Sequence, residues 1–349
     1  MASVPARPIR VVALTPGGGA LAQKLSQVLP GAQCWLPRTL TGAAAGARSF
    51  ERVAAVFQEA FAQGEDLVCI MAAGIVVRGV APYLRGKDAD PAVVVVDEAG
   101  RFAVSLLSGH LGGANDLARQ VARLLNATPV ITTATDVREL PALDLEAARR
   151  GLTIENLEAV RPVQMALLQG RAVSLVDPYG YLADLAAANQ ELFRPGNEAA
   201  AAPAAGPGVY VGFRERTWPL DWLRLRPRCL VAGMGCHRGI PAQEVIDFIT
   251  TTFQREGISL LSLKALATIA ARQAEPGLRE AAQRLGVEFI WFTAAELQDI
   301  TVPNPSPQAA RHLGVASVSE AAALKAGGVE LILPKRKAPN ATLAVARVS

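Results

Sequence analysis

A glycine-rich stretch, "SGHLGGAND" at residues 108–116, gathers side chains that could carry out acid–base chemistry. His110 is one of three histidines in 349 residues, and histidine gains and loses a proton near neutral pH more readily than other side chains. Ser108, Asn115 and Asp116 are close enough along the chain to orient His110 or a substrate. We therefore treat His110, Ser108 and Asp116 as candidate catalytic residues, with Asn115 as a substrate-binding candidate.

The three glycines of this stretch favour a turn between a strand and a helix. An apolar run, Phe102–Leu107, precedes it, and the following run carries apolar residues at helical spacing up to Leu125. Bare backbone at Gly109, Gly112 and Gly113 would let a ligand approach, and amides at a helix start attract carboxylates, phosphates or a developing oxyanion. An alternative is equally consistent: the glycines only permit a tight turn, Asn115 or Asp116 caps the helix, and His110 makes a local hydrogen bond.

Further polar candidates lie in other segments of the first half of the chain. They are Thr132, Thr133 and Asp136 in "ITTATD" (131–136), the anion-binding candidates Arg78, Arg85 and Lys87, and the acids Asp97 and Glu98 after an apolar strand. Hydroxyls at the carboxyl end of a strand often line the ligand crevice of an open α/β sheet. Taken singly, each segment also fits ordinary turn, cap or surface residues.

A second glycine-rich turn, "GMGCHRG" at residues 233–239, follows an apolar strand and matches a dinucleotide loop loosely. The acid expected about 20 residues later is not clearly placed. Cys236 and Arg238 are substrate-binding candidates here, although a cysteine in such a turn is more often a small packing residue. His237 and His312 have no partner at metal-ligand spacing, so we expect no metal site built by the protein.

Short apolar runs alternate with amphipathic helical patterns along the chain, which predicts a doubly wound α/β fold with largely parallel strands. A Pro/Ala/Gly-rich stretch, residues 194–208, indicates a linker or long loop. We divide the chain into an N-terminal α/β domain (1–140), a variable middle region with its linker (141–225) and a C-terminal α/β domain (226–349).

Composition narrows the class of protein. The four cysteines form no CxxC pair, so a reducing cytoplasm is expected. The longest apolar run is too short to span a bilayer. The net charge of +4 comes from dispersed basic residues, with only "KRK" (335–337) clustered, which favours a polyanionic small molecule over nucleic acid. A homo-oligomer is compatible with the sequence.

The motifs in their order resemble one known family. The blocks "AAGIVVR", "DPAVVVVDEAG", "LLSGHLGGAN" and "PVITTATD", followed by "VAGMGCHRGIPAQEV" and a final "TLAVAR", resemble the cobalt-precorrin-5A hydrolases of anaerobic cobalamin biosynthesis. The likeness covers nearly the whole chain. It departs from the family pattern at Thr268 and Arg272, where that family usually carries a serine and a lysine.

The resemblance implies hydrolysis of a δ-lactone on a cobalt-containing tetrapyrrole, with loss of a two-carbon unit as acetaldehyde. Cobalt would arrive with the substrate, so no cofactor of the protein's own is expected. The carboxylate arms of the macrocycle would be partners for the basic side chains, and transient contact with other enzymes of the pathway is a further expectation. Two alternatives stay open: a corrinoid carrier without catalysis, and a nucleotide-dependent oxidoreductase using residues 233–239.

Overall fold

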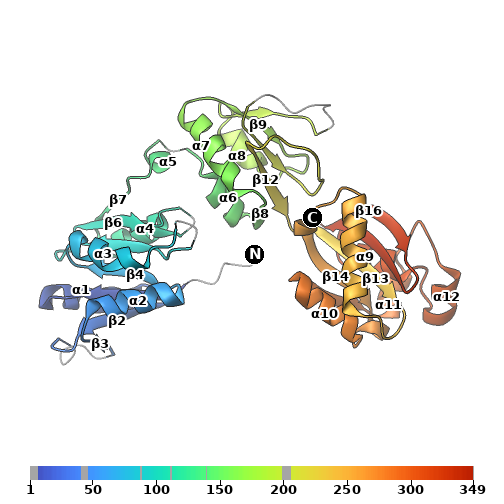
Figure 1. The fold of residues 1–349 in the computed structure, drawn as a ribbon, viewed down its shortest axis with the longest axis horizontal. Helices are drawn as coiled ribbons and strands as arrows, with labels where there is room; N and C mark the ends of the chain where they lie inside the picture. Colours follow the sequence, from blue (N-terminus) through green and yellow to red (C-terminus); the bar gives the residue numbers. More distant parts are fainter. Residues whose placement is uncertain are drawn as a thin grey trace. The chain divides into compact units, whose positions relative to one another are not determined.

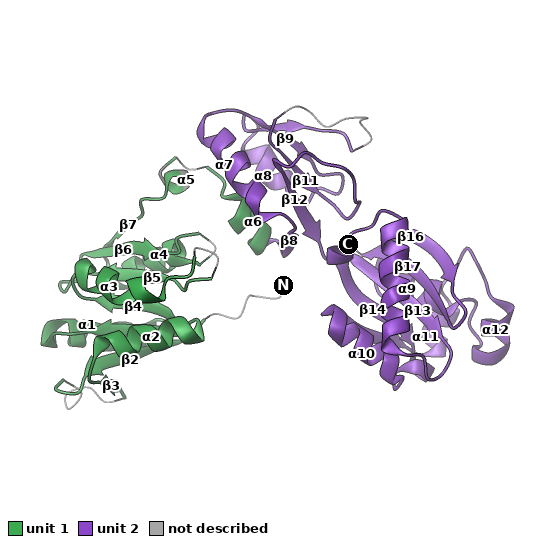
Figure 2. Ribbon diagram, viewed as in Figure 1, with its two compact units in different colours: residues 1–149 green, residues 150–349 purple. Residues whose placement is uncertain are grey.

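The computed structural model describes residues 7–40, 46–86, 89–110, 112–138, 140–198 and 206–348. The chain divides into two compact units, Met1–Arg149 and Arg150–Ser349 (Figure 2). The first unit holds one sheet and the second holds two (Figure 1). The α/β class with largely parallel sheets is confirmed, while the three-domain division stays a prediction.

The first unit is built on a seven-stranded sheet of order β3-β2-β1-β4-β5-β6-β7. Its strands are β1 (Ile9–Ala13), β2 (Ala32–Pro37), β3 (Arg48–Phe50), β4 (Asp66–Ile70), β5 (Val93–Val96), β6 (Phe102–Leu107) and β7 (Thr128–Val130). Its helices are α1 (Pro16–Val28), α2 (Val53–Gln63), α3 (Ala73–Val80), α4 (Ala114–Leu125), α5 (Ala134–Val137) and α6 (Leu143–Arg149), with the 3₁₀ turn η2 (Ala81–Tyr83).

Helices cover both faces of this sheet, which explains its uninterrupted apolar strands. Side chains of α1 and α4, such as Leu25 and Val121, pack against one face. Side chains of α2 and α3, such as Phe57 and Val76, pack against the other. Central strands buried on both faces need apolar residues at every position, and all four valines of β5 are buried.

The direction of β6 decides where the candidate site forms. β5 and β6 pair in antiparallel fashion, with Val93 opposite Leu107, whereas β6 and β7 run parallel to each other. The carboxyl ends of β6 and β7 therefore lie at one edge of the sheet, beside the start of β5. The segments after those strands, residues 108–113 and 131–136, meet at this edge.

The second unit contains a five-stranded sheet of order β10-β9-β11-β12-β8, parallel except for β8. Its strands are β8 (Leu152–Ile154), β9 (Val173–Val176), β10 (Phe193–Pro195), β11 (Gly208–Val211) and β12 (Trp222–Pro227). Helical segments between them are η3 (Leu157–Ala159), α7 (Val160–Leu168) and α8 (Ala183–Ala188). The predicted linker begins inside β10, and its residues 199–205 lie outside the described ranges.

The other sheet of the second unit has the order β15-β14-β13-β17-β16, with β13, β14 and β15 parallel and β16 and β17 antiparallel to their neighbours. Its strands are β13 (Leu230–Cys236), β14 (Leu263–Ile269), β15 (Glu288–Phe292), β16 (Gly328–Lys337) and β17 (Ala341–Val348). Its helices are α9 (Ala242–Arg255), α10 (Pro276–Leu285), α11 (Ala294–Gln298), α12 (Pro307–Leu313) and α13 (Val318–Lys325), with η4 (Leu260–Ser262) and η5 (Ala270–Arg272).

Candidate active site

The turn after β6 closes on itself through its own backbone. The amide of Gly113 donates to the carbonyl of His110 at 2.8 Å, Ala114 donates to Ser108 at 3.0 Å, and Asn115 donates to Gly109 at 3.1 Å. The first amides of α4 are thus used inside the turn. The sequence led us to expect the amides of Gly112 and Gly113 to face a ligand. Because the Gly113 amide is used inside the turn, the Gly112 amide is left as the candidate donor to an oxyanion.

The glycines are required by the turn itself. A Cβ on Gly112 would lie 2.2 Å from Cβ of Ser108, and one on Gly109 would lie 2.7 Å from Oδ1 of Asn115. Gly113 has φ +88°, in the left-handed region that favours glycine. Ser108 also has a positive φ, +60°, and its buried Oγ finds no hydrogen-bond partner among the described residues. The turn therefore has its own reasons for bare backbone, apart from any ligand.

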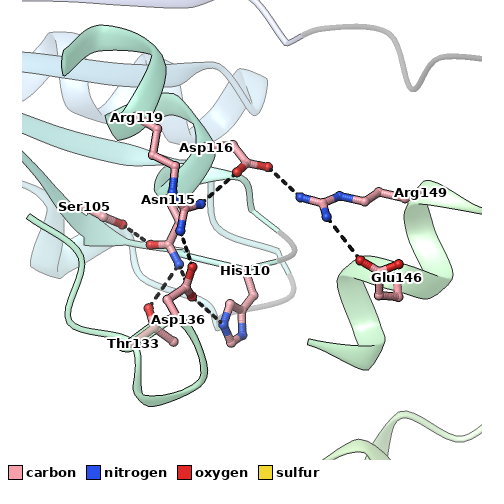
Figure 3. Close-up of polar contacts among 9 residues, drawn as sticks. All are labelled: Ser105, His110, Asn115, Asp116, Arg119, Thr133, Asp136, Glu146 and Arg149. Atoms are coloured by element: carbon pink, nitrogen blue, oxygen red, sulfur yellow. Dashed lines mark hydrogen bonds and ion pairs between the residues drawn. The ribbon is translucent and has the colours of Figure 1, made fainter. Parts of the chain in front are cut away.

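Asn115 joins three segments at this edge of the sheet (Figure 3). Its side chain is only 2% exposed. Its Oδ1 accepts from the hydroxyl of Ser105 on β6 at 2.7 Å, and its Nδ2 donates to Thr133 Oγ1 at 3.1 Å and to Asp136 Oδ2 at 2.9 Å. Neither Asn115 nor Asp116 caps α4, whose N-cap is Gly113. Asn115 acts instead as the buried connector of the site.

His110 and Asp136 form the central pair of the site. Nε2 of His110 lies 3.4 Å from Oδ2 of Asp136, and the two side chains are 25% and 17% exposed. The other carboxylate oxygen of Asp136 accepts from the guanidinium of Arg119, and this hydrogen bond raises the pKa of Arg119. Figure 3 shows Asp136 between the imidazole and the Arg119–Asn115 side of α4. Asp136 is thereby fixed beside the imidazole as a hydrogen-bond acceptor.

Asp116 contacts the same guanidinium group of Arg119 that binds Asp136, but through the other terminal nitrogen (Figure 3). Its carboxylate is 3.0 Å from Arg119 Nη1 and 3.4 Å from Arg149 Nη2, and Arg149 also pairs with Glu146 at 3.1 Å. This carboxylate is 57% exposed, and two guanidinium groups share it. This arrangement suits Asp116 to holding Arg119, so its assignment as a catalytic residue stays a prediction that the geometry does not favour.

The sequence reasoning overlooked Arg119, Ser105 and Arg149. Helical spacing carried a signal for Arg119, because it follows Asn115 by four residues and so shares its face of α4. Ser105 lies on the predicted strand Phe102–Leu107. Because side chains alternate between the two faces of a strand, the pattern indicated that Ser105 and Leu106 point to opposite faces. Arg149 offered no signal, since its contact with Asp116 depends on the path of the chain after β7.

The remaining predicted residues of the first unit are dispersed. Thr132 is exposed between β7 and α5. Arg78 is exposed in the last turn of α3, with its guanidinium against Gly74. Lys87 lies outside the described residues. Arg85 enters the loop before β5, where its amide donates to Asp90.

The acids after β5, Asp97 and Glu98, lie at the edge of the sheet opposite to the one where β6 and β7 end. Burial acts to raise the pKa of Asp97, but hydrogen bonds from the amides of Phe102 and Arg101 outweigh it and hold the pKa below its usual value. Glu98 accepts from the hydroxyl of Thr15 at 2.7 Å. Both acids therefore have local roles, in a hairpin turn and beside the start of α1.

In the second unit, the turn after β13 is braced by the two residues that depart from the family pattern. Thr268 donates its hydroxyl to the carbonyl of Met234 at 2.7 Å, and Arg272 Nε donates to the carbonyl of Cys236 at 3.0 Å. Burial raises the pKa of the Cys236 thiol to about 11, although the nearby Arg272 acts in the opposite direction. Cys236 is therefore a neutral thiol at physiological pH, as expected of a packing residue. Arg238 is exposed.

Two of the three glycines of residues 233–239 are explained by packing. A Cβ on Gly233 would lie 1.9 Å from the carbonyl of Ser319 on α13, and one on Gly235 would lie 2.7 Å from Thr342 Oγ1. They allow α13 and β17 to approach β13 closely. Gly233 and Gly235 therefore have a packing role that requires no dinucleotide.

The residues that the structure describes contain neither a metal-binding cluster nor a membrane-spanning helix. Within the described ranges, no group of three His, Cys, Asp or Glu side chains is arranged to hold a metal ion. Among the helices that the structure describes, none combines the length and apolarity needed to cross a bilayer.

Comparison with known proteins identifies related sequences along the whole chain. Three family models match: cobalamin synthesis G N-terminal at residues 55–136, cobalamin biosynthesis central region at 141–227, and cobalamin synthesis G C-terminus at 230–346. The chain is 36% identical to a cobalt-precorrin-5A hydrolase of Priestia megaterium, over 82% of this chain and 80% of that protein. It is 35% identical to a cobalt-precorrin-5A hydrolase of Salmonella typhimurium, over 93% of each.

Among solved structures, the chain matches CobE, a protein from the cobalamin (vitamin B12) biosynthetic pathway. The match has 36% identity and a TM-score of 0.33, and it covers 35% of this chain and 91% of that one.

Proposed function

The chain belongs to the cobalt-precorrin-5A hydrolase family, and from this membership we propose that it opens the δ-lactone of cobalt-precorrin-5A with His110 as the base. Water attacks the ester carbonyl while the imidazole takes its proton, and the ring oxygen leaves as an alkoxide. The alkoxide then collapses to acetaldehyde as its carbon–carbon bond breaks, and the electron pair passes into the conjugated macrocycle. The product is cobalt-precorrin-5B.

The single observation that carries the catalytic assignment is the contact between His110 Nε2 and Asp136 at 3.4 Å. A base of this kind becomes an imidazolium as it takes the proton of water. A carboxylate at this distance stabilises the positive charge and holds the ring in one orientation.

The neighbours of Asp136 support this role. Arg119 and Asn115 both donate to its carboxylate, which fixes its position beside the imidazole. Because Asn115 is buried and fully engaged, we assign it a positioning role in place of direct substrate binding. Thr133 shares that role through its hydrogen bond to Asn115.

We assign substrate contacts to the glycine-rich turn and to basic side chains. The Gly112 amide is the candidate for stabilising the oxyanion, with Ser108 and Gly109 forming the wall of the turn. Arg78 and Lys87 are candidates for the carboxylate arms of the tetrapyrrole, and Arg238 stays a candidate predicted from the sequence alone. Cobalt is part of the substrate in this scheme, and the protein needs no cofactor of its own.

Incubation of the purified chain with cobalt-precorrin-5A, followed by derivatisation and quantification of acetaldehyde, tests the function. Stoichiometric acetaldehyde supports hydrolysis. Binding of the tetrapyrrole without acetaldehyde would identify a carrier and contradict the proposal.

A further inference from the structure

One edge of the last sheet carries an exposed apolar strand. β15 pairs with β14 on one side only, and no strand of the described chain pairs with its other side. Its sequence is "EFIWF", and Trp291 is 43% exposed. A groove of about 550 Å³ runs beside it, lined by Phe289–Phe292 and Lys325–Gly327. An edge of this kind offers unpaired backbone groups and apolar side chains to another strand.

The opposite edge of the same sheet is protected. β16 is interrupted by three irregularities of register against β17, and it contains Pro334 followed by Lys335, Arg336 and Lys337. Bulges, proline and lysine are the features that keep an edge strand from pairing with other chains. β15 has a regular register with β14 and contains neither proline nor lysine. The contrast indicates that β15 is an edge built to be paired.

We propose that β15 pairs in antiparallel fashion with β15 of a second copy of this chain, about a twofold axis through Ile290. In this register Phe289 lies opposite Trp291 of the partner subunit, and the symmetry repeats the pair. Cross-strand aromatic pairs of this kind stabilise sheets. The β15-containing sheets of the two copies become one continuous sheet. Assembly stops at a dimer, because each copy uses the same surface for the contact.

Charge is complementary in the same register. Ile290 and Phe292 pack on the face of the sheet that α13 covers, whereas Phe289 packs on the other face. Since side chains alternate along a strand, Glu288 shares the face of Ile290. Glu288 of the partner subunit therefore lies opposite Phe292 on the α13 face, where the exposed Lys325 lines the groove. The pairing brings a carboxylate to each Lys325, and this favours a second copy over an unrelated strand.

The test measures the mass of the full chain in solution by sedimentation velocity over a range of concentrations. The wild type is expected at twice the mass of the chain, and Trp291→Lys is expected at the mass of the monomer. Val329→Lys is the matched control, because Val329 is 65% exposed on the protected edge strand β16, and it should remain dimeric. Circular dichroism establishes that each variant is folded.

A charge exchange tests the register independently of Trp291. Glu288→Lys and Lys325→Glu should each weaken the dimer by about tenfold or more, because each brings like charges together. The double variant carrying both changes should restore it. A monomeric wild type, a dimer that survives Trp291→Lys, or a double variant as weak as the single ones would overturn the proposal. The result does not depend on the hydrolase activity.

Discussion

Nε2 of His110 lies 3.4 Å from Oδ2 of Asp136, although the two residues come from different turns at the edge of the sheet. The contact exists because β6 and β7 run parallel and end at the same edge. An imidazole beside a carboxylate that is itself held by an amide and a guanidinium is arranged to accept a proton and to stabilise the resulting charge.

Replacing the acid should lower the rate. Asp136→Asn removes the negative charge that would stabilise the imidazolium formed when His110 takes the proton of water, so we expect kcat to fall by about tenfold or more. Asp116→Asn is the matched control, because that carboxylate is exposed and, among the residues that the structure describes, pairs with Arg119 and Arg149 and not with His110. Equal losses in the two variants would remove Asp136 from the mechanism.

Asn115→Ala should lower both stability and activity. It leaves the hydroxyl of Ser105 and one acceptor oxygen of Asp136 without their buried partner, which we expect to cost about 1–3 kcal/mol in the free energy of unfolding. Chemical denaturation measures the loss. Asn340→Ala, at an exposed asparagine, should change stability by no more than about 0.5 kcal/mol. A fully stable, fully active Asn115→Ala enzyme would show that the connector is dispensable.

The turn should tolerate no side chain at residue 112. In Gly112→Ala the new Cβ would collide with Ser108, so the turn must open and displace His110. We expect turnover to be lost in a protein that keeps its circular dichroism spectrum. Gly19→Ala is the control, since its nearest side-chain atom lies at an ordinary 3.4 Å and alanine favours a helix. Normal kinetics for Gly112→Ala would contradict the packing of this turn.

Cys236 should behave as an ordinary, unactivated thiol. Because its pKa is raised to about 11, the thiolate is scarce at pH 7–8 and its fraction grows as the pH rises toward that value. Alkylation by iodoacetamide, followed by mass spectrometry of the peptide, should be slow at pH 7.5 and faster at pH 10. Cys236→Ala should retain activity. Rapid alkylation at neutral pH would instead indicate an activated thiol.

Local sequence patterns predicted much of the fold. The apolar run Phe102–Leu107 is β6 without change, and the helix expected over Asp116–Leu125 is α4, which begins at Ala114. Other boundaries depend on strand pairing. Helix α2 begins only at Val53, because Arg48–Phe50 before it pairs with β2 as a strand. A local pattern does not contain such pairing.

The candidate site was predictable in its parts and not in its connections. Glycine spacing and a rare histidine pointed to residues 108–116, and strand-end chemistry pointed to Thr133 and Asp136. Their meeting depends on β6 and β7 running parallel to each other and antiparallel to β5, which the apolar pattern does not encode. The engagement of the Gly113 amide depends on how the turn folds back on itself, so the oxyanion donor was assigned too broadly.

The most direct test of the account is a single-turnover measurement of acetaldehyde release from cobalt-precorrin-5A, across pH, for the wild type and His110→Ala. His312→Ala is the control, since His312 is exposed on α12. If His110 is the base, His110→Ala should slow the chemical step by about 10²–10⁴-fold and lose the acid limb of the profile, with substrate affinity little changed. A loss of only a few-fold with the acid limb intact would show that His110 is a structural residue of the turn and that another group takes the proton.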